Sequence, residues 1–411
     1  MSVNKQLKVL MINYEFPPIG GGGGTTTRFL AKYMVRLGLD VSVITAKPGN
    51  ENTFMHPDGF KIHYVGPTKK NHTTTYIKEL TRFMLTTIYY SKKIISSIQP
   101  DINHCFFSIP CGAFGLYCKK GFNIPYITST LGADVPGFNI GDRRLNAYHF
   151  LTQGLTKAIW NHSSYVVANS SSLKSLCEEF SPNLKLKYDS ITNGVDTDIF
   201  YPINSQKKIN QNEIKLLYVS RLSSQKGIET LIKACGILKN KQVTNFKLTV
   251  VGDGPLRDKM FALIHKLDIK DKVDFIGWKT LEELPDIYRN SDIFILPSVM
   301  EGMPSVVLQA MACSLPIIAS RVKGFEEVME ENVNGLTAEY NNETAFANTI
   351  EQLIKSPDLL NKMSKNSFEK SKQFSWDTIA KKYLELYEKV INDKSINNKT
   401  KKQREYSKAR K

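Results

Sequence analysis

The stretch FILPSVMEGMPSVVLQAMACSLPIIA, residues 294–319, decides the fold of this chain. The apolar run Phe294–Leu296 is typical of a buried strand, and a Pro-Ser pair ends it. A short loop with one acid, Glu301, leads into a helix with Pro304 in its first turn, where a missing N–H is tolerated. A second apolar strand follows at 315–319. Strand, glycine-containing loop, helix and strand follow one another here in the order of a βαβ unit.

The start of that helix is a candidate anion site. The first backbone N–H groups of a helix lack intrahelical partners and carry the positive end of the helix dipole. A carboxylate at Glu301 would repel a phosphate, so we expect Glu301 to accept hydrogen bonds from hydroxyl groups. Gln309 lies about two turns further on, on the same side of the helix. This pair suits a ligand with phosphates and sugar hydroxyls; the alternatives are an N-capping acid and a solvent-facing glutamine.

A second loop carries two cations. The strand at 214–219 is followed by SRLSSQKG, which places Arg221 and Lys226 before a helix predicted at 227–239. Two cations beside a strand end can neutralise a diphosphate, the arginine as a planar fork and the lysine as a point charge.

Five consecutive glycines, residues 20–24, follow the first predicted strand, Lys8–Ile12. A helix is predicted to open at Thr25. Without side chains the backbone amides can approach a ligand closely. The run is neither a dinucleotide fingerprint nor a P-loop, because its spacing differs and no Gly-Lys-Ser/Thr closes it. Taken alone, the run fits a flexible loop as well as a binding site.

The stretch at 294–319 resembles the E-x7-E signature of the retaining glycosyltransferases of family 4, also called glycosyl transferases group 1, which have the GT-B fold. Glu301 matches the first acid, and Gln309 stands where relatives carry the second. The loop at 221–227 also matches, as does the V-P-G that follows Asp134, whereas Leu131 stands where relatives carry His or Arg. The resemblance covers residues 8 to about 391.

The resemblance implies roles for single residues. Glu301 would contact the transferred sugar, Gln309 the ribose, and Asp134 the acceptor, although Asp134 also fits a turn-initiating residue. Trp278 would lie at the nucleotide base, with an ordinary core position as the alternative. The expected catalytic residues are Glu301, Arg221, Lys226 and Asp134, and the expected donor-binding residues are Gly22, Gly23, Gly252, Gly277, Trp278, Gly302, Met303, Pro304, Ser305 and Gln309.

The resemblance also implies the domain organisation. Two doubly wound, Rossmann-like α/β domains with parallel sheets would face each other over a cleft. Residues 1–200 would bind the acceptor and residues 201–375 the nucleotide-sugar, with a polar linker at 202–212. A helix at 376–391 would cross back to the first domain. Residues 392–411 have almost no apolar content and are predicted to be a basic disordered tail.

Composition limits the protein class. The six cysteines show no C-x-x-C spacing, which indicates reduced core residues in a cytoplasmic protein, and no metal or other cofactor is expected. No signal peptide is predicted, and no apolar run approaches the ~20 residues that span a bilayer.

The net charge of +16 is uneven, because residues 1–200 hold 21 basic against 13 acidic residues and the last twenty hold 8 against 2. This excess suggests an anionic membrane surface as a partner; nucleic acid is disfavoured because no recognisable module is present, and a merely lysine-rich soluble protein is the third option.

The resemblance implies a hexosyltransferase. It would move a sugar from a nucleotide-sugar, first a UDP-sugar and second GDP-mannose, to a glycan or lipid-linked acceptor in cell-surface polysaccharide synthesis. The enzyme would be cytoplasmic, with a possible peripheral position at the inner face of the membrane. Gln309 and Leu131 motivate the alternative of a non-catalytic GT-B pseudoenzyme or binding subunit.

Overall fold

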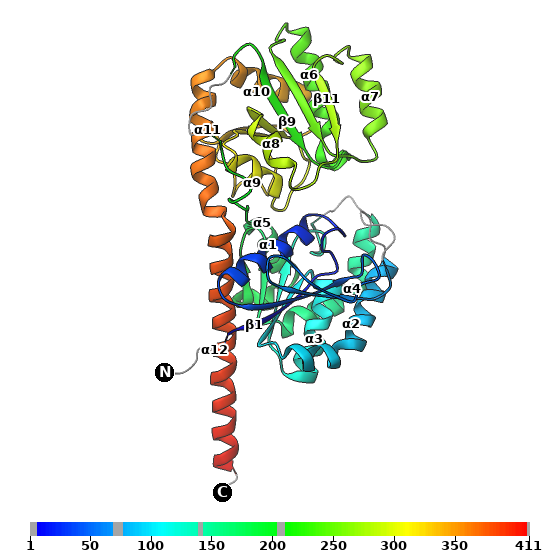
Figure 1. Cartoon of the computed structure of the whole chain (residues 1–411), viewed down its shortest axis with the longest axis vertical. Coiled ribbons are helices and arrows are strands. Elements are labelled where there is room, and N and C mark those ends of the chain that lie inside the picture. Colours follow the sequence, from blue (N-terminus) through cyan, green and yellow to red (C-terminus); the bar gives the residue numbers. More distant parts are fainter. Residues whose placement is uncertain (1–5, 69–76, 139–142, 204–209, 409–411) are drawn as a thin grey trace. The chain divides into compact units, whose positions relative to one another are not determined.

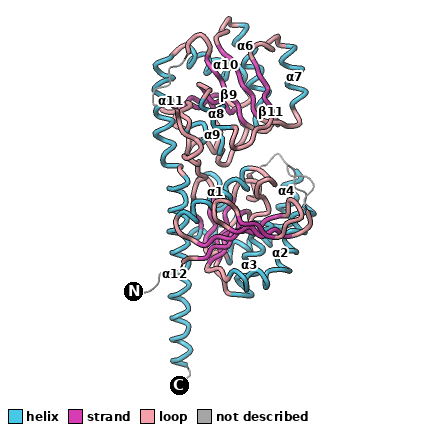
Figure 2. Tube along the Cα trace, in the orientation of Figure 1, coloured by secondary structure: helices cyan, strands magenta, loops and turns pink. Residues whose placement is uncertain are grey.

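The computed structural model describes residues 6–68, 77–138, 143–203 and 210–408 (Figure 1). The chain forms two compact units, one of Met1–Asn193 with Trp376–Lys411 and the other of Gly194–Ser375. Each unit contains one sheet covered by helices, as the apolar strand runs predict (Figure 2). The doubly wound α/β architecture expected from the sequence is therefore confirmed in both units.

The sheet of the first unit has the order β3-β4-β2-β1-β5-β6-β7-β8 and is parallel except for the antiparallel edge strand β3. Its strands are β1 (Lys8–Ile12), β2 (Asp40–Ala46), β3 (Thr53–Met55), β4 (Lys61–Val65), β5 (Ile102–Phe106), β6 (Tyr126–Thr130), β7 (Tyr165–Ala168) and β8 (Tyr188–Ser190). Its helices are α1 (Gly22–Arg36), α2 (Ile77–Ile98), α3 (Ala113–Phe122), α4 (Arg143–His162), α5 (Ser171–Phe180) and α12 (Trp376–Lys408). The predicted helix at Thr25 therefore begins three residues earlier, inside the glycine run.

Alternate side chains of the first sheet enter two different layers. Leu10, Ile12 and Cys105 belong to the apolar core that α2, α3, α4 and α5 cover. On the other face, α1 and α12 lie side by side, and Phe29 of α1 stacks on Trp376 of α12 with ring centroids 6.1 Å apart. The sheet is thus buried on both sides, which explains its nearly continuous apolar strands.

The second unit has a six-stranded parallel sheet in the order β11-β10-β9-β12-β13-β14. Its strands are β9 (Ile214–Val219), β10 (Phe246–Val251), β11 (Val273–Gly277), β12 (Ile293–Leu296), β13 (Ile317–Ser320) and β14 (Gly335–Ala338). Its helices are α6 (Ile228–Asn240), α7 (Arg257–Lys266), α8 (Leu284–Arg289), α9 (Ser305–Ala312), α10 (Glu343–Ile354) and α11 (Pro357–Ser371). The central strands β9 and β12 are almost entirely buried, as their apolar sequences predict.

The boundary between the units differs from the prediction. The sequence places it at residue 200, whereas the structure places it at Asn193 and Gly194. Val195 N–H donates to the carbonyl of Phe374 at 2.8 Å, and Val195 and Phe200 are buried in the core of the second unit. This segment therefore belongs to the second unit before the polar linker begins; residues 204–209 of that linker lie outside the described part.

The C-terminal segment also differs from the prediction. Helix α12 continues to Lys408, although residues 392–411 are predicted to be disordered. Low apolar content removes packing partners, but the segment contains no glycine or proline that would end the helix. Residues 409–411 lie outside the described part. No helix among the described residues is long and apolar enough to cross a bilayer.

A buried polar cluster fastens α12 to the first sheet and makes stability depend on pH. His104 of β5 bonds through Nδ1 to the Tyr387 hydroxyl and through Nε2 to Ser129 Oγ, both at 2.6 Å. Burial lowers the pKa of His104 to about 3. In the unfolded chain its pKa returns to about 6.5, so below that pH the unfolded state binds a proton that the folded state does not. Stability is therefore expected to fall as the pH drops from about 6.5 towards 3.

The test compares how the free energy of unfolding depends on pH in the parent and in a variant without His104. Urea unfolding is measured between neutral and mildly acidic pH for the parent and for His104→Gln, which cannot titrate. Below pH 6 the parent should lose up to about 1.4 kcal/mol more per pH unit than the variant, the limit for one proton. Equal pH slopes would show that His104 titrates alike in both states.

Candidate active site

The candidate site lies at the switch point of the second sheet. Here β9 and β12 are neighbours, but the chain leaves β9 towards β10 on one side and leaves β12 towards β13 on the other. Helices α6, α7 and α10 pack together, whereas α9 packs with α8 and α11. The two loops that follow β9 and β12 therefore diverge, and in open parallel sheets this is the place where ligands bind.

Close backbone contacts hold these loops together. The Val299 N–H donates to the Gln225 carbonyl at 2.9 Å. Gly227 has φ +67°, and a side chain there would overlap the Pro297 carbonyl oxygen. Gly324, after β13, has φ +98° and lies in the same way against the Glu301 carbonyl. The loops after β9, β12 and β13 thus form one packed assembly whose glycines are required by the close approach.

Lys226 and Glu301 form an ion pair in this assembly. Lys226 Nζ lies 2.7 Å from Glu301 Oε1, and the Ser298 hydroxyl donates to the same oxygen at 2.6 Å. The Glu301 side chain is 7% exposed and that of Lys226 is 24% exposed. Within the described residues both bonds reach Oε1, which leaves Oε2 to accept from a ligand. Two of the three ammonium protons of Lys226 likewise remain for an anion.

Tyr218, at the end of β9, fixes the loop that carries the two cations. Its buried hydroxyl shares one proton between the carbonyl oxygens of Arg221 and Lys226, each 3.3 Å away. The Arg221 side chain is exposed at the carboxyl edge of the sheet. Gly252 has φ +126° and touches the carbonyl of Ser220. Tyr218 was not among the predicted site residues. A hydroxyl near the end of an otherwise apolar strand is the sequence feature that could have indicated it.

Helix α9 begins at Ser305, with Pro304 as its N-cap residue rather than in its first turn. Pro304 makes no side-chain hydrogen bond to the first N–H groups of the helix. Gln309 is buried and its Oε1 accepts from the Tyr288 hydroxyl at 3.1 Å, so the solvent-facing alternative for Gln309 is wrong. Gly302 and Met303 lie in the buried loop between Glu301 and the helix.

The residues expected at the nucleotide base lie at the end of β11. The Gly252 N–H donates to the Gly277 carbonyl at 2.8 Å, which joins this segment to the loop beside Arg221. Trp278 is 71% exposed, so the alternative that it is an ordinary core residue is wrong. Among the described residues no group of three or more His, Cys, Asp or Glu could hold a metal ion.

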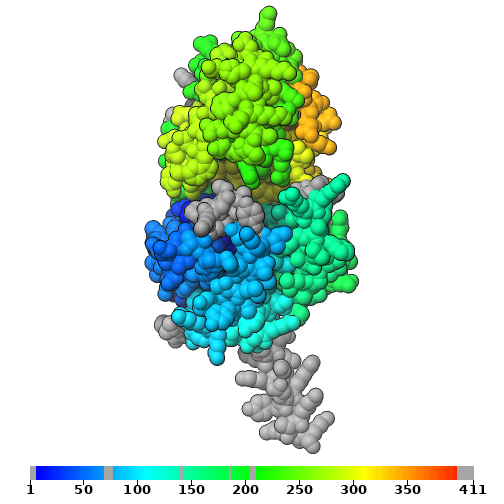
Figure 3. Space-filling view, turned by 90° about the vertical axis from the view of Figure 1, so that its right-hand side faces the viewer, coloured from blue at the N-terminus to red at the C-terminus, as the bar shows by residue number. Residues whose placement is uncertain are grey.

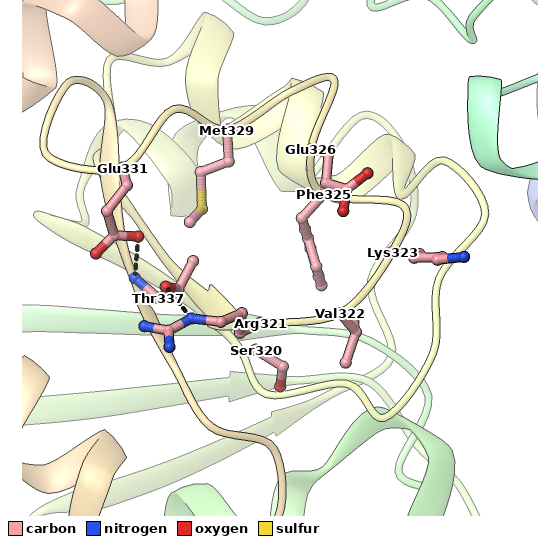
Figure 4. A pocket seen from close by; sticks show the side chains of 9 residues that line it. All are labelled: Ser320, Arg321, Val322, Lys323, Phe325, Glu326, Met329, Glu331 and Thr337. Carbon is pink, nitrogen blue, oxygen red and sulfur yellow. Dashed lines mark hydrogen bonds between the residues drawn. The ribbon is translucent and has the colours of Figure 1, made fainter.

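A hollow of about 510 Å³ lies at the carboxyl end of β13 (Figure 4). Arg321 Nε donates to Thr337 Oγ1 at 3.3 Å, and Glu331 accepts from the Thr337 N–H at 2.9 Å. The residues that line the hollow are Ser320, Arg321, Val322, Lys323, Phe325, Glu326, Met329, Glu331 and Thr337. The loop that carries Gly324 therefore borders both the hollow and Glu301.

The glycine run belongs to the first unit, at the switch point between β1 and β5. Asn13 is fully buried, and its amide donates to the Gly23 carbonyl at 3.1 Å and to Thr27 Oγ1 at 2.7 Å. A side chain at Gly23 would collide with the Phe107 ring, and Gly22 is the first residue of α1. The run is thus an organised helix start, and its contact with a donor remains a prediction.

Asp134 organises the neighbouring loops. One carboxylate oxygen accepts from the Ser108 N–H at 2.9 Å and from the Ser108 hydroxyl at 3.1 Å. The other accepts from the N–H groups of Leu131 at 3.0 Å and Gly132 at 3.2 Å. Burial raises the pKa of Asp134, and these bonds oppose the rise. The carboxylate thus holds the backbone of the preceding residues Leu131 and Gly132 and of Ser108, and acceptor contact by Asp134 stays a prediction.

Residues 20–199 match the family described as Glycosyltransferase Family 4, and residues 202–370 match Glycosyl transferases group 1. The uncharacterized glycosyltransferase MJ1607 of Methanocaldococcus jannaschii is 28% identical over 404 residues, which cover 93% of this chain and 98% of that protein.

Solved structures show the same fold. Sucrose-phosphate synthase from Thermosynechococcus elongatus has a TM-score of 0.79 at 22% identity, over 94% of this chain and 100% of that one. Anabaena Alr3699/HepE, solved in complex with UDP and glucose, has a TM-score of 0.71 at 18% identity, over 93% of this chain and 100% of that one. With two parallel-sheet units, an ion pair at the switch point of the second and family matches along both, the chain has the GT-B fold and belongs to the family 4 glycosyltransferases, in which it is a hexosyltransferase.

Proposed function

We propose that this chain transfers a hexose from a nucleotide-sugar with retention of anomeric configuration. The supporting observation is the Lys226–Glu301 pair beside the start of α9. A diphosphate at this edge would meet the Lys226 ammonium, the Arg221 guanidinium and the first N–H groups of α9. All three stabilise the negative charge that develops on the leaving diphosphate.

The ion pair explains how an acid can stand beside a diphosphate. Lys226 offsets the negative charge of Glu301 and keeps the carboxylate in place through Oε1. Glu301 Oε2 can then accept from hydroxyl groups of the transferred sugar, and Gln309 can contact the ribose as a neutral group. In same-face transfer the leaving phosphate accepts the proton of the acceptor hydroxyl, so no separate base at Leu131 is required.

The proposed donor is a UDP-sugar, with GDP-mannose as the second candidate. Alr3699/HepE, which shares the fold, was solved with UDP and glucose. We further propose that the first unit binds a glycan or lipid-linked acceptor in cell-surface polysaccharide synthesis. The basic excess of residues 1–200 supports an anionic or membrane-borne acceptor and a cytoplasmic enzyme at the inner face of the membrane.

A thermal-shift series tests the donor, because a ligand that binds the folded state alone raises the melting temperature. UDP should raise the melting temperature of the parent, and GDP should raise it less. Lys226→Ala should reduce the UDP shift. A larger shift with GDP would indicate GDP-mannose as the donor. No shift with either nucleotide would contradict the proposed nucleotide-binding site.

Gln309 and Leu131 support a second candidate, a non-catalytic GT-B pseudoenzyme or binding subunit. This candidate allows nucleotide binding but predicts no turnover. Slow hydrolysis of UDP-glucose by the purified protein, lost in Glu301→Gln, would support the enzyme. Binding of UDP without hydrolysis of any nucleotide-sugar supplied would favour the pseudoenzyme.

A further inference from the structure

The solvent-facing side of helices α2, α3 and α4, here called the α2–α4 face, combines exposed apolar side chains with a one-sided positive charge. The helices are neighbours in one layer, since α3 contacts both α2 and α4. Figure 3 draws the residues of these helices in light blue, cyan and turquoise on one face of the first unit. Their inner sides are already buried against the first sheet, through residues such as Phe83, Phe114 and Trp160.

The first property is apolar exposure. Tyr89 is 80% exposed, Phe150 72%, Leu151 81% and Leu85 59%. A helix that covers a sheet normally turns polar residues to water on its outer side. Because these helices bury other apolar residues in the core, the outer ones are not needed for folding of the unit. Several large apolar side chains on one face indicate an interaction surface.

The second property is a one-sided charge. Basic residues number four in α2, two in α3 and three in α4, and Glu79 is the single acidic residue in these three helices. Lys92, Lys93, Lys120 and Lys157 are exposed. The remaining cations of the face lie among the apolar residues along the same helices. The charge requires an anionic partner, and the interleaved apolar groups require one with an apolar interior.

We propose that the α2–α4 face binds an anionic lipid bilayer. Aromatic rings favour the level of the lipid headgroups, and lysines with long aliphatic stems can reach the phosphates while leucines enter the acyl boundary. Nucleic acid would satisfy the cations but offers no apolar region for Leu85 and Leu151. The inference does not depend on the proposed transfer reaction, since none of these residues belongs to the candidate active site.

Vesicle flotation of the full-length protein tests the proposal. Binding is compared for vesicles of phosphatidylcholine alone and vesicles that also contain phosphatidylglycerol. The parent should float with the anionic vesicles, and Lys92→Gln/Lys93→Gln should lower its partition coefficient by about tenfold or more. Phe150→Ser/Leu151→Ser should lower the coefficient by about tenfold as well, because the apolar insertion is lost.

Matched controls lie on the second unit. Lys266→Gln/Lys270→Gln removes two exposed lysines, and Tyr340→Ser removes an exposed aromatic side chain. Both controls should bind the anionic vesicles like the parent. If the controls lost as much binding as the face variants, the attraction would be general charge and the α2–α4 face would be rejected.

The buried cysteines permit a direct measurement of insertion. All six are free and buried, so a cysteine introduced at Leu151 can be labelled selectively with a polarity-sensitive fluorophore. Emission from Leu151→Cys should shift to the blue on anionic vesicles, while Tyr340→Cys should not shift. A label at residue 151 that stays in water while the protein is vesicle-bound would overturn the proposal.

Two further outcomes would also overturn it. Removal of residues 392–411 tests the basic C-terminal segment, and vesicle binding should largely persist without it. If that deletion abolished binding while the face variants retained it, the C-terminal segment would be the lipid contact. If the face variants lost binding to labelled DNA or RNA and the parent ignored anionic vesicles, the partner would be nucleic acid.

Discussion

Lys226→Ala is expected to lower kcat/KM for sugar transfer by about a hundredfold or more, the scale of losing one oriented charge contact to a developing anion. Lys226 Nζ lies 2.7 Å from Glu301 Oε1 on a loop fixed by Tyr218 and by the Gln225–Val299 bond. Its remaining protons would meet the leaving diphosphate. Since that diphosphate is charged before and after the transfer, nucleotide binding should weaken together with turnover.

The control is Lys233→Ala. Lys233 lies on α6, which follows the same loop, and it pairs with Glu229 at 3.3 Å on the protein surface. Transfer rate and UDP affinity should stay within about twofold of the parent, since exposed pairs of this kind contribute little. If Lys226→Ala bound UDP and turned over the donor like the parent, the loop after β9 would not be the diphosphate site.

The sequence predicted the main elements of the site because their signals are local. The strand before Glu301 is an uninterrupted apolar run, and Arg221 and Lys226 follow a second such run at a short spacing. In a parallel sheet the carboxyl ends of strands share one edge, so both loops could be assigned to that edge. The direct bond between Lys226 and Glu301 could not be predicted, since it depends on β9 and β12 being neighbours.

The missed features depend on contacts between distant segments. In the sequence, Gly227 and Gly324 are typical of ordinary loops. Only the structure shows that Pro297 and Glu301 approach them too closely for a side chain. The solvent-facing alternative for Gln309 could not be excluded from the sequence, because its partner, the Tyr288 hydroxyl, lies on another helix. The boundary between the units differs from the predicted one for the same reason, because Val195 bonds to Phe374, far along the chain.

Glu301→Gln is expected to lower the transfer rate by about a hundredfold while leaving UDP binding intact or tighter. The substitution keeps the size of the side chain and one carbonyl oxygen for the Ser298 hydroxyl, but it removes the negative charge. The amide accepts more weakly from sugar hydroxyls, which reduces stabilisation of the sugar as the bond to the diphosphate breaks. Lys226, freed from its counter-charge, would then interact more strongly with the diphosphate.

The opposite effects on UDP separate the two partners of the ion pair. A structural salt bridge predicts that either substitution lowers the melting temperature and that both change UDP affinity in the same direction. If Lys226 serves the diphosphate and Glu301 serves the sugar, UDP binding should weaken in Lys226→Ala and stay unchanged or tighten in Glu301→Gln. Both variants should lose transfer. Calorimetric titration of UDP and transfer assays on each single variant and the double variant measure these quantities. Because the two groups act on one donor, the double variant should lose far less than the product of the single losses. Weaker UDP binding in Glu301→Gln would show that Glu301 does not serve the sugar separately from the diphosphate.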